Sequence, residues 1–152
     1  MNELEQQAYI FGSIFILSNR LQVLGDAFDK NITIKQWLFL VTVAGFKEPP
    51  TVSEVADHIR YSRQNAKRLA ATLEQSGFVT ISKDKSDARA LRIALTPKFN
   101  VYFTERNQRE LAFMQKLFSG FDPELTNGFY QGLVKLSENI EMMEKEYEGI
   151  KE

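Results

Sequence analysis

The spacing of hydrophobic positions changes along the chain, and each spacing predicts a different kind of element. Between residues 3 and 28, apolar side chains recur at alternating steps of four and three, which predicts one long helix with a heptad seam. The seam consists of Ile10, Ile14, Leu17, Leu21, Leu24 and Phe28. A similar stripe predicts a long last helix, which opens with the cap-plus-proline pair Asp122–Pro123 and reaches Ile150.

Three shorter helices are predicted between residues 33 and 76. The first runs from a Thr33 cap to about Phe46. The second begins with a capping box, in which Thr51 and Glu54 each satisfy a backbone amide near the other residue. The third begins after a Ser62 cap and runs to about Ser76, where the following glycine ends it.

The period then changes from helical to strict alternation, which predicts two β-strands. Val79 and Ile81 mark the first strand, and Leu91, Ile93 and Leu95 mark the second. The polar segment from Lys83 to Ala90 between them predicts a hairpin with a long tip, and Thr96–Pro97 opens a fifth helix. The expected fold is therefore mainly α with one small β-hairpin.

The composition excludes several classes of site. The 152 residues include no cysteine and one histidine, His58, so disulfides, thiolate zinc sites, cysteine redox sensing and histidine-rich metal sites are excluded. The chain also lacks a glycine-rich phosphate loop and any nucleophile–base pair, so we expect no enzyme, cofactor or metal. No leader precedes the short apolar run Tyr9–Leu17, which is too short to span a membrane, so we expect a cytoplasmic protein.

Charge is distributed unevenly. The whole chain has a net charge of −1, yet residues 58–92 hold eight Lys/Arg and three acids, which gives +5 there and −6 elsewhere. A local basic patch on a near-neutral body is the electrostatic footprint of a nucleic-acid surface, although a solvated basic face would look the same.

The predicted helix after Ser62 gives this patch a chemical meaning. Ala66, Leu69, Ala70 and Leu73 fall on one face, so the opposite face presents donors and acceptors that match base edges and phosphates. An ordinary surface helix would more often alternate Glu with Lys, whereas Glu74 is the only acid here. We therefore predict DNA contacts from the N-terminal half of this helix, by Ser62, Arg63, Gln64, Asn65, Lys67 and Arg68.

The charged hairpin tip is a second candidate contact. Arginine suits a narrow minor groove, and a nearby carboxylate can hold its guanidinium in one orientation. The tip residues concerned are Lys83, Lys85, Asp87 and Arg89. Alone, this segment would read as a solvated turn, but a charged hairpin directly after a helix-turn-helix is a much rarer combination.

These segments together resemble the MarR family of bacterial transcriptional regulators. The matching runs are Thr33–Trp37, Thr51–Ala56, Ser62–Arg63, Leu73–Glu74, Gly77–Val79, Asp84-x-x-Asp87-x-Arg89 and Leu95–Pro97. The resemblance implies a winged helix-turn-helix at residues 31–97, with residues 1–30 and 98–152 forming a helical dimerisation region in one continuous fold. It also implies an obligate homodimer that binds a pseudo-palindromic operator in double-stranded DNA.

The resemblance further implies roles for single residues. Arg89 matches the family's minor-groove arginine, and Asp87 matches the aspartate that supports it. Two positions depart from the family: Ser86 stands where a second wing arginine is usual, and Phe99 replaces a common glycine. Weaker wing binding follows from the first departure.

Many relatives are released from DNA by a small phenolic or lipophilic ligand. Phe11, Phe15, Trp37 and Phe99 are candidates for such a pocket, although the sequence favours the simpler interpretation that these aromatic side chains are core. The predicted function is a dimeric, sequence-specific regulator, a repressor released by a ligand. The alternative is a protein-interaction module of the same fold, favoured by the near-neutral charge and by the acidic segment 138–152, with six Glu and two Lys.

Overall fold

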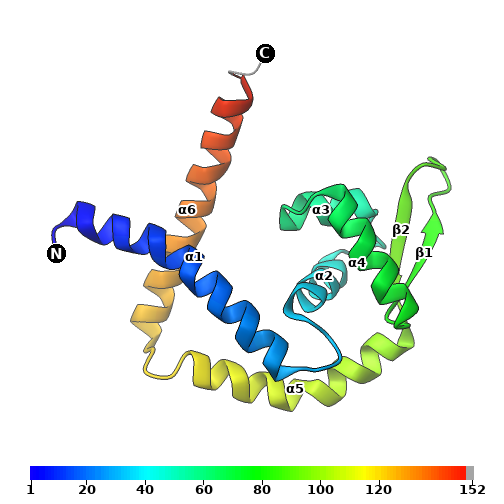
Figure 1. Cartoon of the computed structure of the whole chain (residues 1–152), viewed down its shortest axis with the longest axis horizontal. Helices are drawn as coiled ribbons and strands as arrows, with labels where there is room; N and C mark the ends of the chain where they lie inside the picture. The colour runs from blue at the N-terminus through cyan, green and yellow to red at the C-terminus, as the bar shows by residue number, and fades with distance from the viewer. Residues whose placement is uncertain (150–152) are drawn as a thin grey trace. The chain divides into compact units, whose positions relative to one another are not determined.

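The computed structural model describes residues 1–149, which form six helices and one two-stranded antiparallel sheet (Figure 1). In chain order the elements are α1 (Glu3–Phe28), α2 (Ile34–Gly45), α3 (Val52–Ile59), α4 (Arg63–Gln75), β1 (Val79–Lys83), β2 (Leu91–Leu95), α5 (Pro97–Leu117) and α6 (Pro123–Gly149). The predicted mainly helical class with one hairpin is confirmed. Ile150, the predicted end of the last helix, lies outside the described residues.

The chain divides into two compact units, Met1–Glu105 and Arg106–Glu152. None of the helices within residues 1–149 is both long and apolar enough to cross a membrane. The first unit holds the helix-turn-helix and the hairpin, and it is the unit that positions the candidate site.

The shorter helices begin where the sequence places caps. At α3 the Glu54 amide donates to Thr51 Oγ1 at 3.2 Å, and the Thr51 amide donates to Glu54 Oε2 at 2.6 Å, so the predicted capping box is confirmed. Hydrogen bonding of the Glu54 carboxylate to the Thr51 backbone amide, and to the Thr51 side chain, holds the pKa of Glu54 below its usual range. The helix α4 ends before Gly77, whose φ of +79° is a left-handed conformation that glycine adopts without strain.

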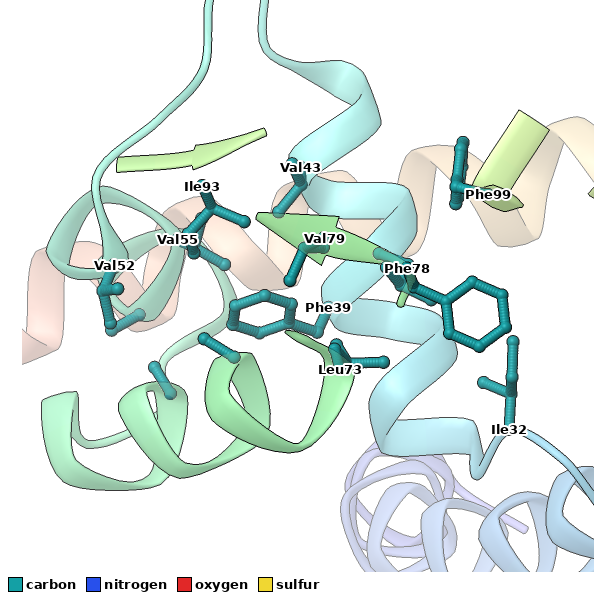
Figure 2. Close-up of a cluster of buried hydrophobic side chains, with 14 residues drawn as sticks. Ile32, Phe39, Val43, Val52, Val55, Leu73, Phe78, Val79, Ile93 and Phe99 are labelled. Carbon is teal, nitrogen blue, oxygen red and sulfur yellow. The ribbon is translucent and has the colours of Figure 1, made fainter. Parts of the chain in front are cut away.

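The core of the first unit lies between α2, α3, α4 and the sheet (Figure 2). Large apolar side chains from all four parts meet there, and each is less than 2% exposed: Phe39, Leu40, Val55, Leu73, Val79 and Ile93. Burial of each such side chain contributes about 1.5–3 kcal/mol relative to exposure. This core fixes α4 against α2 and α3.

The hairpin is joined to the same core through its second strand. Its register pairs Val79 with Leu95 and Ile81 with Ile93. The Ile93 amide donates to the Pro50 carbonyl at 2.9 Å, and Thr51 forms an isolated antiparallel bridge with Arg92. The segment before α3 therefore lies along β2 like a short third strand.

The long helices α1 and α6 differ from the core elements because their apolar faces are open. Gly25 is the only buried residue of α1, and a Cβ there would lie 2.8 Å from Ile34 Cδ1, so α1 approaches α2 closely at that point. Exposed large apolar side chains include Ile10, Leu17, Leu21 and Leu24 on α1, and Phe129, Leu133, Ile140 and Met143 on α6.

Candidate nucleic-acid interface

The helix α4 has one buried face and one polar exposed face, as the sequence predicts. Ala66, Ala70 and Leu73 are at most 1% exposed, and Leu69 packs partly buried against them. The opposite side leaves the predicted contact residues in solvent: Arg63, Gln64, Asn65, Lys67 and Arg68. Two of the three buried positions are alanines, so the helix sits close to its core.

The turn between α3 and α4 sets where this exposed face begins. Arg60 ends α3 in a left-handed conformation with a φ of 57°, which is uncommon for a residue with a side chain. Ser62 then caps α4, since its Oγ accepts a hydrogen bond from the Asn65 amide at 3.2 Å. The predicted cap is confirmed, and the Ser62 hydroxyl is therefore already engaged within the protein.

The one acid of α4 does not oppose an anionic partner on the exposed face. Glu74 Oε2 accepts a hydrogen bond from the Ile81 amide at 2.6 Å. This bond commits the carboxylate to the first strand of the hairpin. The N-terminal half of α4 thus presents amides and cations without a carboxylate.

Two of the exposed side chains are bonded to each other. Arg68 Nη2 donates to Asn65 Oδ1 at 3.1 Å, across one turn of the helix. The Arg68 carbonyl also accepts a hydrogen bond from Thr72 Oγ1 at 3.0 Å. Asn65 and Arg68 therefore present one joint polar surface.

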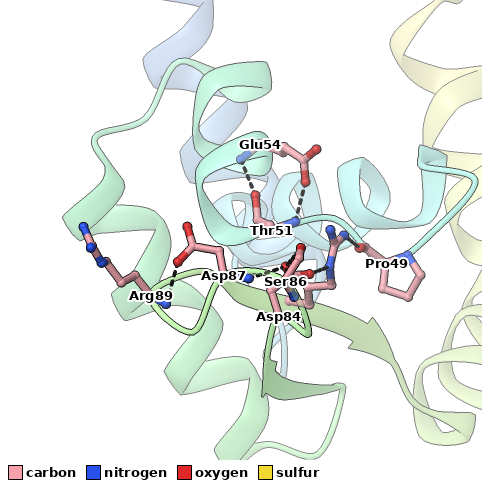
Figure 3. Close-up of polar contacts among 8 residues, drawn as sticks. Pro49, Thr51, Glu54, Asp84, Ser86, Asp87 and Arg89 are labelled. Atoms are coloured by element: carbon pink, nitrogen blue, oxygen red, sulfur yellow. Dashed lines mark hydrogen bonds and ion pairs between the residues drawn. The ribbon is translucent and has the colours of Figure 1, made fainter.

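The loop between β1 and β2, residues 84–90, is organised around the Asp84 carboxylate (Figure 3). Asp84 Oδ2 accepts hydrogen bonds from the Ser86 amide at 3.0 Å, the Ser86 hydroxyl at 2.6 Å and the Asp87 amide at 3.0 Å. The Ser86 hydroxyl and the Arg92 guanidinium hold the pKa of Asp84 well below its usual range. Asp84 is therefore a structural carboxylate.

Arg92 connects this loop to the segment before α3. Its Nε donates to Asp84 Oδ1, and its Nη1 donates to the Pro49 carbonyl at 2.7 Å. The ion pair raises the pKa of Arg92 above its usual range. We call Asp84, Arg92 and the Pro49 carbonyl the wing anchor. The sequence placed Arg92 in the basic patch without this role, because its partners lie 8 and 43 residues away.

Arg89 extends away from the wing anchor, from the exposed side of the loop (Figure 3). Its backbone amide donates to Asp87 Oδ1 at 2.9 Å, so Asp87 supports Arg89 through the main chain. The guanidinium of Arg89 has no protein partner within residues 1–149, and Lys83 and Lys85 of the same hairpin are also exposed. The sequence suggested that a carboxylate holds this guanidinium. In the structure, Asp87 instead forms a local turn with the Arg89 backbone amide.

The four aromatic residues considered for a ligand pocket lie in different environments. Phe11 and Phe15 are 67% and 58% exposed on α1, with their rings edge to face at 5.2 Å. Trp37 is partly buried against the core, and Phe99 lies within it at 8% exposure. One copy of the chain does not gather the four around one cavity.

A surface hollow of about 370 Å³ lies between α2 and α3 instead, and none of those four aromatic residues lines it. Its lining consists of Val41, Thr42, Gly45, Phe46 and His58. Within residues 1–149, no group of three or more metal-ligating side chains comes together.

Known proteins are similar to residues 30–90 in sequence and to the chain in fold. The model of the MarR family matches residues 30–90. The HTH-type transcriptional regulator YfiV of Bacillus subtilis (strain 168) is 30% identical over 95 residues, which span 62% of this chain and 59% of that protein.

Solved structures match more of the chain at lower identity. A MarR protein from Peptoclostridium difficile has a TM-score of 0.78 at 20% identity, covering 87% of each chain. A MarR/EmrR family regulator from Acinetobacter sp. ADP1 also has a TM-score of 0.78, at 16% identity, covering 90% of this chain and 97% of that one. BpsR of Bordetella bronchiseptica, whose DNA binding is regulated by 6-hydroxynicotinic acid, has a TM-score of 0.67 at 18% identity, covering 82% and 98%.

The matched segment, residues 30–90, contains α2, α3, α4 and the loop that carries Arg89. Members of this family are transcriptional regulators and not enzymes. The winged helix-turn-helix segment, residues 30–90, thus matches the MarR family in sequence, and the chain shares its fold with MarR structures.

Proposed function

We propose that the protein is a dimeric, sequence-specific DNA-binding regulator that acts in the cytoplasm as a repressor. The observation that carries the proposal is the outer face of α4. Its exposed amides and cations face solvent without a carboxylate, while its inner face is fixed by Ala66, Ala70 and Leu73 in the core. A rigid helix that offers Arg, Gln and Asn side chains matches the donor and acceptor pattern of a major groove.

The wing, residues 79–95, adds a second contact to this proposal. The Arg89 guanidinium has no protein partner in the described part of the chain, and Lys83 and Lys85 of the same hairpin are also exposed. In this proposal Arg89 enters the minor groove next to the half-site that α4 reads, where negative potential is enhanced. The domain assignment stays as the sequence suggests: residues 31–97 contact DNA, and residues 1–30 and 98–152 mediate dimerisation.

A second copy of the chain is the proposed cover for the open apolar faces of α1 and α6. Leu17 and Leu21 on the heptad seam of α1 are 46% and 39% exposed in one copy. A two-fold dimer would place two α4 helices about 34 Å apart, one helical turn of DNA, and would therefore bind a pseudo-palindromic operator.

The dimer is tested by charge substitution on α1. Leu17→Glu should give a monomer in sedimentation equilibrium, because a carboxylate would be buried in the seam. Val23→Glu is the matched control, since Val23 is 73% exposed and lies off the seam. A Leu17→Glu protein that remains dimeric would remove α1 from the interface.

Release by a small aromatic ligand is the remaining part of the proposal. Its support is the aromatic content of α1, α2 and α5 and the regulation of BpsR by 6-hydroxynicotinic acid. Because Phe11 and Phe15 are exposed in one copy, the pocket would need a second copy to close over them. A thermal-shift panel of aromatic acids tests this, and the absence of any stabilising compound would exclude the class.

The DNA-binding function is tested by genome-wide selection of bound fragments with the full-length protein. The proposal expects an enriched pseudo-palindromic motif, and it expects Arg68→Ala to weaken the enrichment of that wild-type motif. If the wild-type protein enriches no sequence, the proposal fails, and the protein-interaction module suggested by the acidic segment 138–152 is favoured instead.

A further inference from the structure

The bond between Arg68 and Asn65 fixes which atoms each side chain can offer to a partner. Arginine carries only donors, so the Asn65 side-chain atom that lies 3.1 Å from Arg68 Nη2 must be the carbonyl oxygen. The Asn65 NH2 group is therefore directed away from Arg68. The geometry itself resolves the orientation of this amide.

The backbone groups of both residues make further local contacts. The Asn65 backbone amide donates to Ser62 Oγ at 3.2 Å, and the Arg68 backbone carbonyl accepts from Thr72 Oγ1 at 3.0 Å. The nearest acid along the helix is Glu74, which is committed to the Ile81 amide. Within the described part of the chain, no carboxylate bonds the Arg68 guanidinium.

The paired side chains consequently present donors toward solvent, from the Asn65 NH2 and the remaining Arg68 N–H groups. An unpaired asparagine recognises adenine, because it can accept from N6 and donate to N7 at the same time. Guanine differs, since its major-groove edge offers two acceptors, O6 and N7. A surface on which donors outnumber acceptors fits guanine better than adenine, because the Asn65 oxygen is turned toward Arg68 and has only one lone pair left for the adenine N6–H2 group.

We propose that Asn65 and Arg68 form one donor unit that reads guanine in each half-site of the operator. The inference rests on the proposed DNA-binding function and deepens it by naming the base. It assigns Asn65 a dual role, in which its oxygen orients the arginine and its NH2 group joins the readout.

In vitro selection from a randomised duplex library tests the inference with the full-length protein. The wild-type motif should contain a guanine in each half-site, and replacing that guanine by 7-deazaguanine should weaken binding about 5- to 100-fold. The deazaguanine arm uses unaltered protein, so it does not depend on the folding of any variant.

Two variants separate the donor unit from general charge. Arg68→Ala frees the Asn65 oxygen, so the preference at that position should shift from guanine toward adenine. Lys67→Ala, an exposed neighbour on the same helix, should weaken binding to all sequences without changing the preferred base.

The outcomes distinguish two failures. The donor unit is overturned if no guanine of the wild-type motif responds to 7-deaza substitution, or if Arg68→Ala leaves the motif unchanged. Sequence-specific binding would stand in both cases. A wild-type protein that selects no motif overturns both the donor unit and the proposed function.

Discussion

The helix α4 and the wing loop both present cations to solvent, but they are held in place by opposite kinds of interaction. The inner face of α4 rests on Ala66, Ala70 and Leu73, which are almost completely buried. The wing loop rests on the Asp84 carboxylate, which accepts hydrogen bonds from Ser86, from Asp87 and from the Arg92 guanidinium. One surface is positioned by the hydrophobic core and the other by a single part-buried ion pair.

Because of this difference, substitutions that displace α4 and substitutions that displace the wing loop should have different effects on the stability of the fold. Burial of apolar area is non-directional and depends little on pH or salt, so α4 can lose its position only when the core itself is disrupted. An ion pair with hydrogen-bonded loop amides can be removed without disturbing the core. The wing should therefore be separable from the fold, whereas α4 should not.

The largest expected effect follows from truncating the base of α4. Leu73→Ala removes a side chain that is 1% exposed, and should lower the free energy of unfolding by about 2–5 kcal/mol. Leu69→Ala is the matched control, because Leu69 is on the same helix and only partly buried, and should cost less. Denaturant unfolding followed by circular dichroism measures both, and equal losses would contradict the core assignment.

Removing the wing anchor should have a smaller and different effect. Arg92→Ala breaks the bonds to Asp84 and Pro49, so the loop should lose its order while the melting temperature stays close to that of the wild type. The slope of log K against log[salt] should fall by up to about 0.9, because the Arg89 contact with DNA is weakened.

The double variant tests whether Arg92 acts through Arg89. Adding Arg92→Ala to Arg89→Ala should produce little further loss of DNA affinity, since the positioned contact is already absent. Independent, additive losses would instead mean that Arg92 contacts DNA directly.

Ser86 should have a weaker influence on the same loop. Its hydroxyl donates one of the bonds to Asp84 at 2.6 Å, and Ser86→Ala removes that donor while leaving the backbone amide bond at 3.0 Å. We expect a small loss of DNA affinity, less than that of Arg92→Ala, in fluorescence anisotropy. A loss as large as that of Arg92→Ala would identify Ser86 as the main support of the loop.

The smallest expected effect is that of pH on the wing. The folded pKa of Asp84 is lowered below its unfolded value of about 3.9, so the stabilisation by the charged carboxylate is present above that value. It is lost only as pH falls through the lowered folded pKa. The backbone NMR signals of Ser86 and Asp87 should therefore not shift between pH 8 and pH 5, and a midpoint within that window would contradict the structural role of Asp84.

Local features of the sequence predicted much of this arrangement. The Thr51–Glu54 capping box, the Ser62 cap and the end of α4 at Gly77 depend on neighbours within a few residues, so their signatures can be read along the chain. The buried face of α4 follows from helical periodicity alone. The exposure of Gln64 and Arg68 follows in turn from that face.

The support of the wing could not be read in the same way. The Arg92 side chain meets the Pro49 carbonyl across 43 residues, and only the folded register of β2 beside the segment before α3 brings them together. The backbone turn at Asp87 could have been predicted from the sequence, because the aspartate side chain commonly accepts a hydrogen bond from the backbone amide two residues later. The sequence suggested a carboxylate–guanidinium pair there, while the carboxylate–guanidinium pair of this loop lies between Asp84 and Arg92.

The central claim is that α4 reads the base sequence while the wing adds an electrostatic contact. A salt titration of binding to the selected operator and to an unrelated duplex, for wild type, Arg68→Ala and Arg89→Ala, tests it most directly. Arg68→Ala should reduce the preference for the operator by about 1–3 kcal/mol. Arg89→Ala should instead reduce the salt slope by about 0.9 and weaken both duplexes alike. Folded variants that bind the operator as the wild type does, with the same preference and slope, would contradict the account.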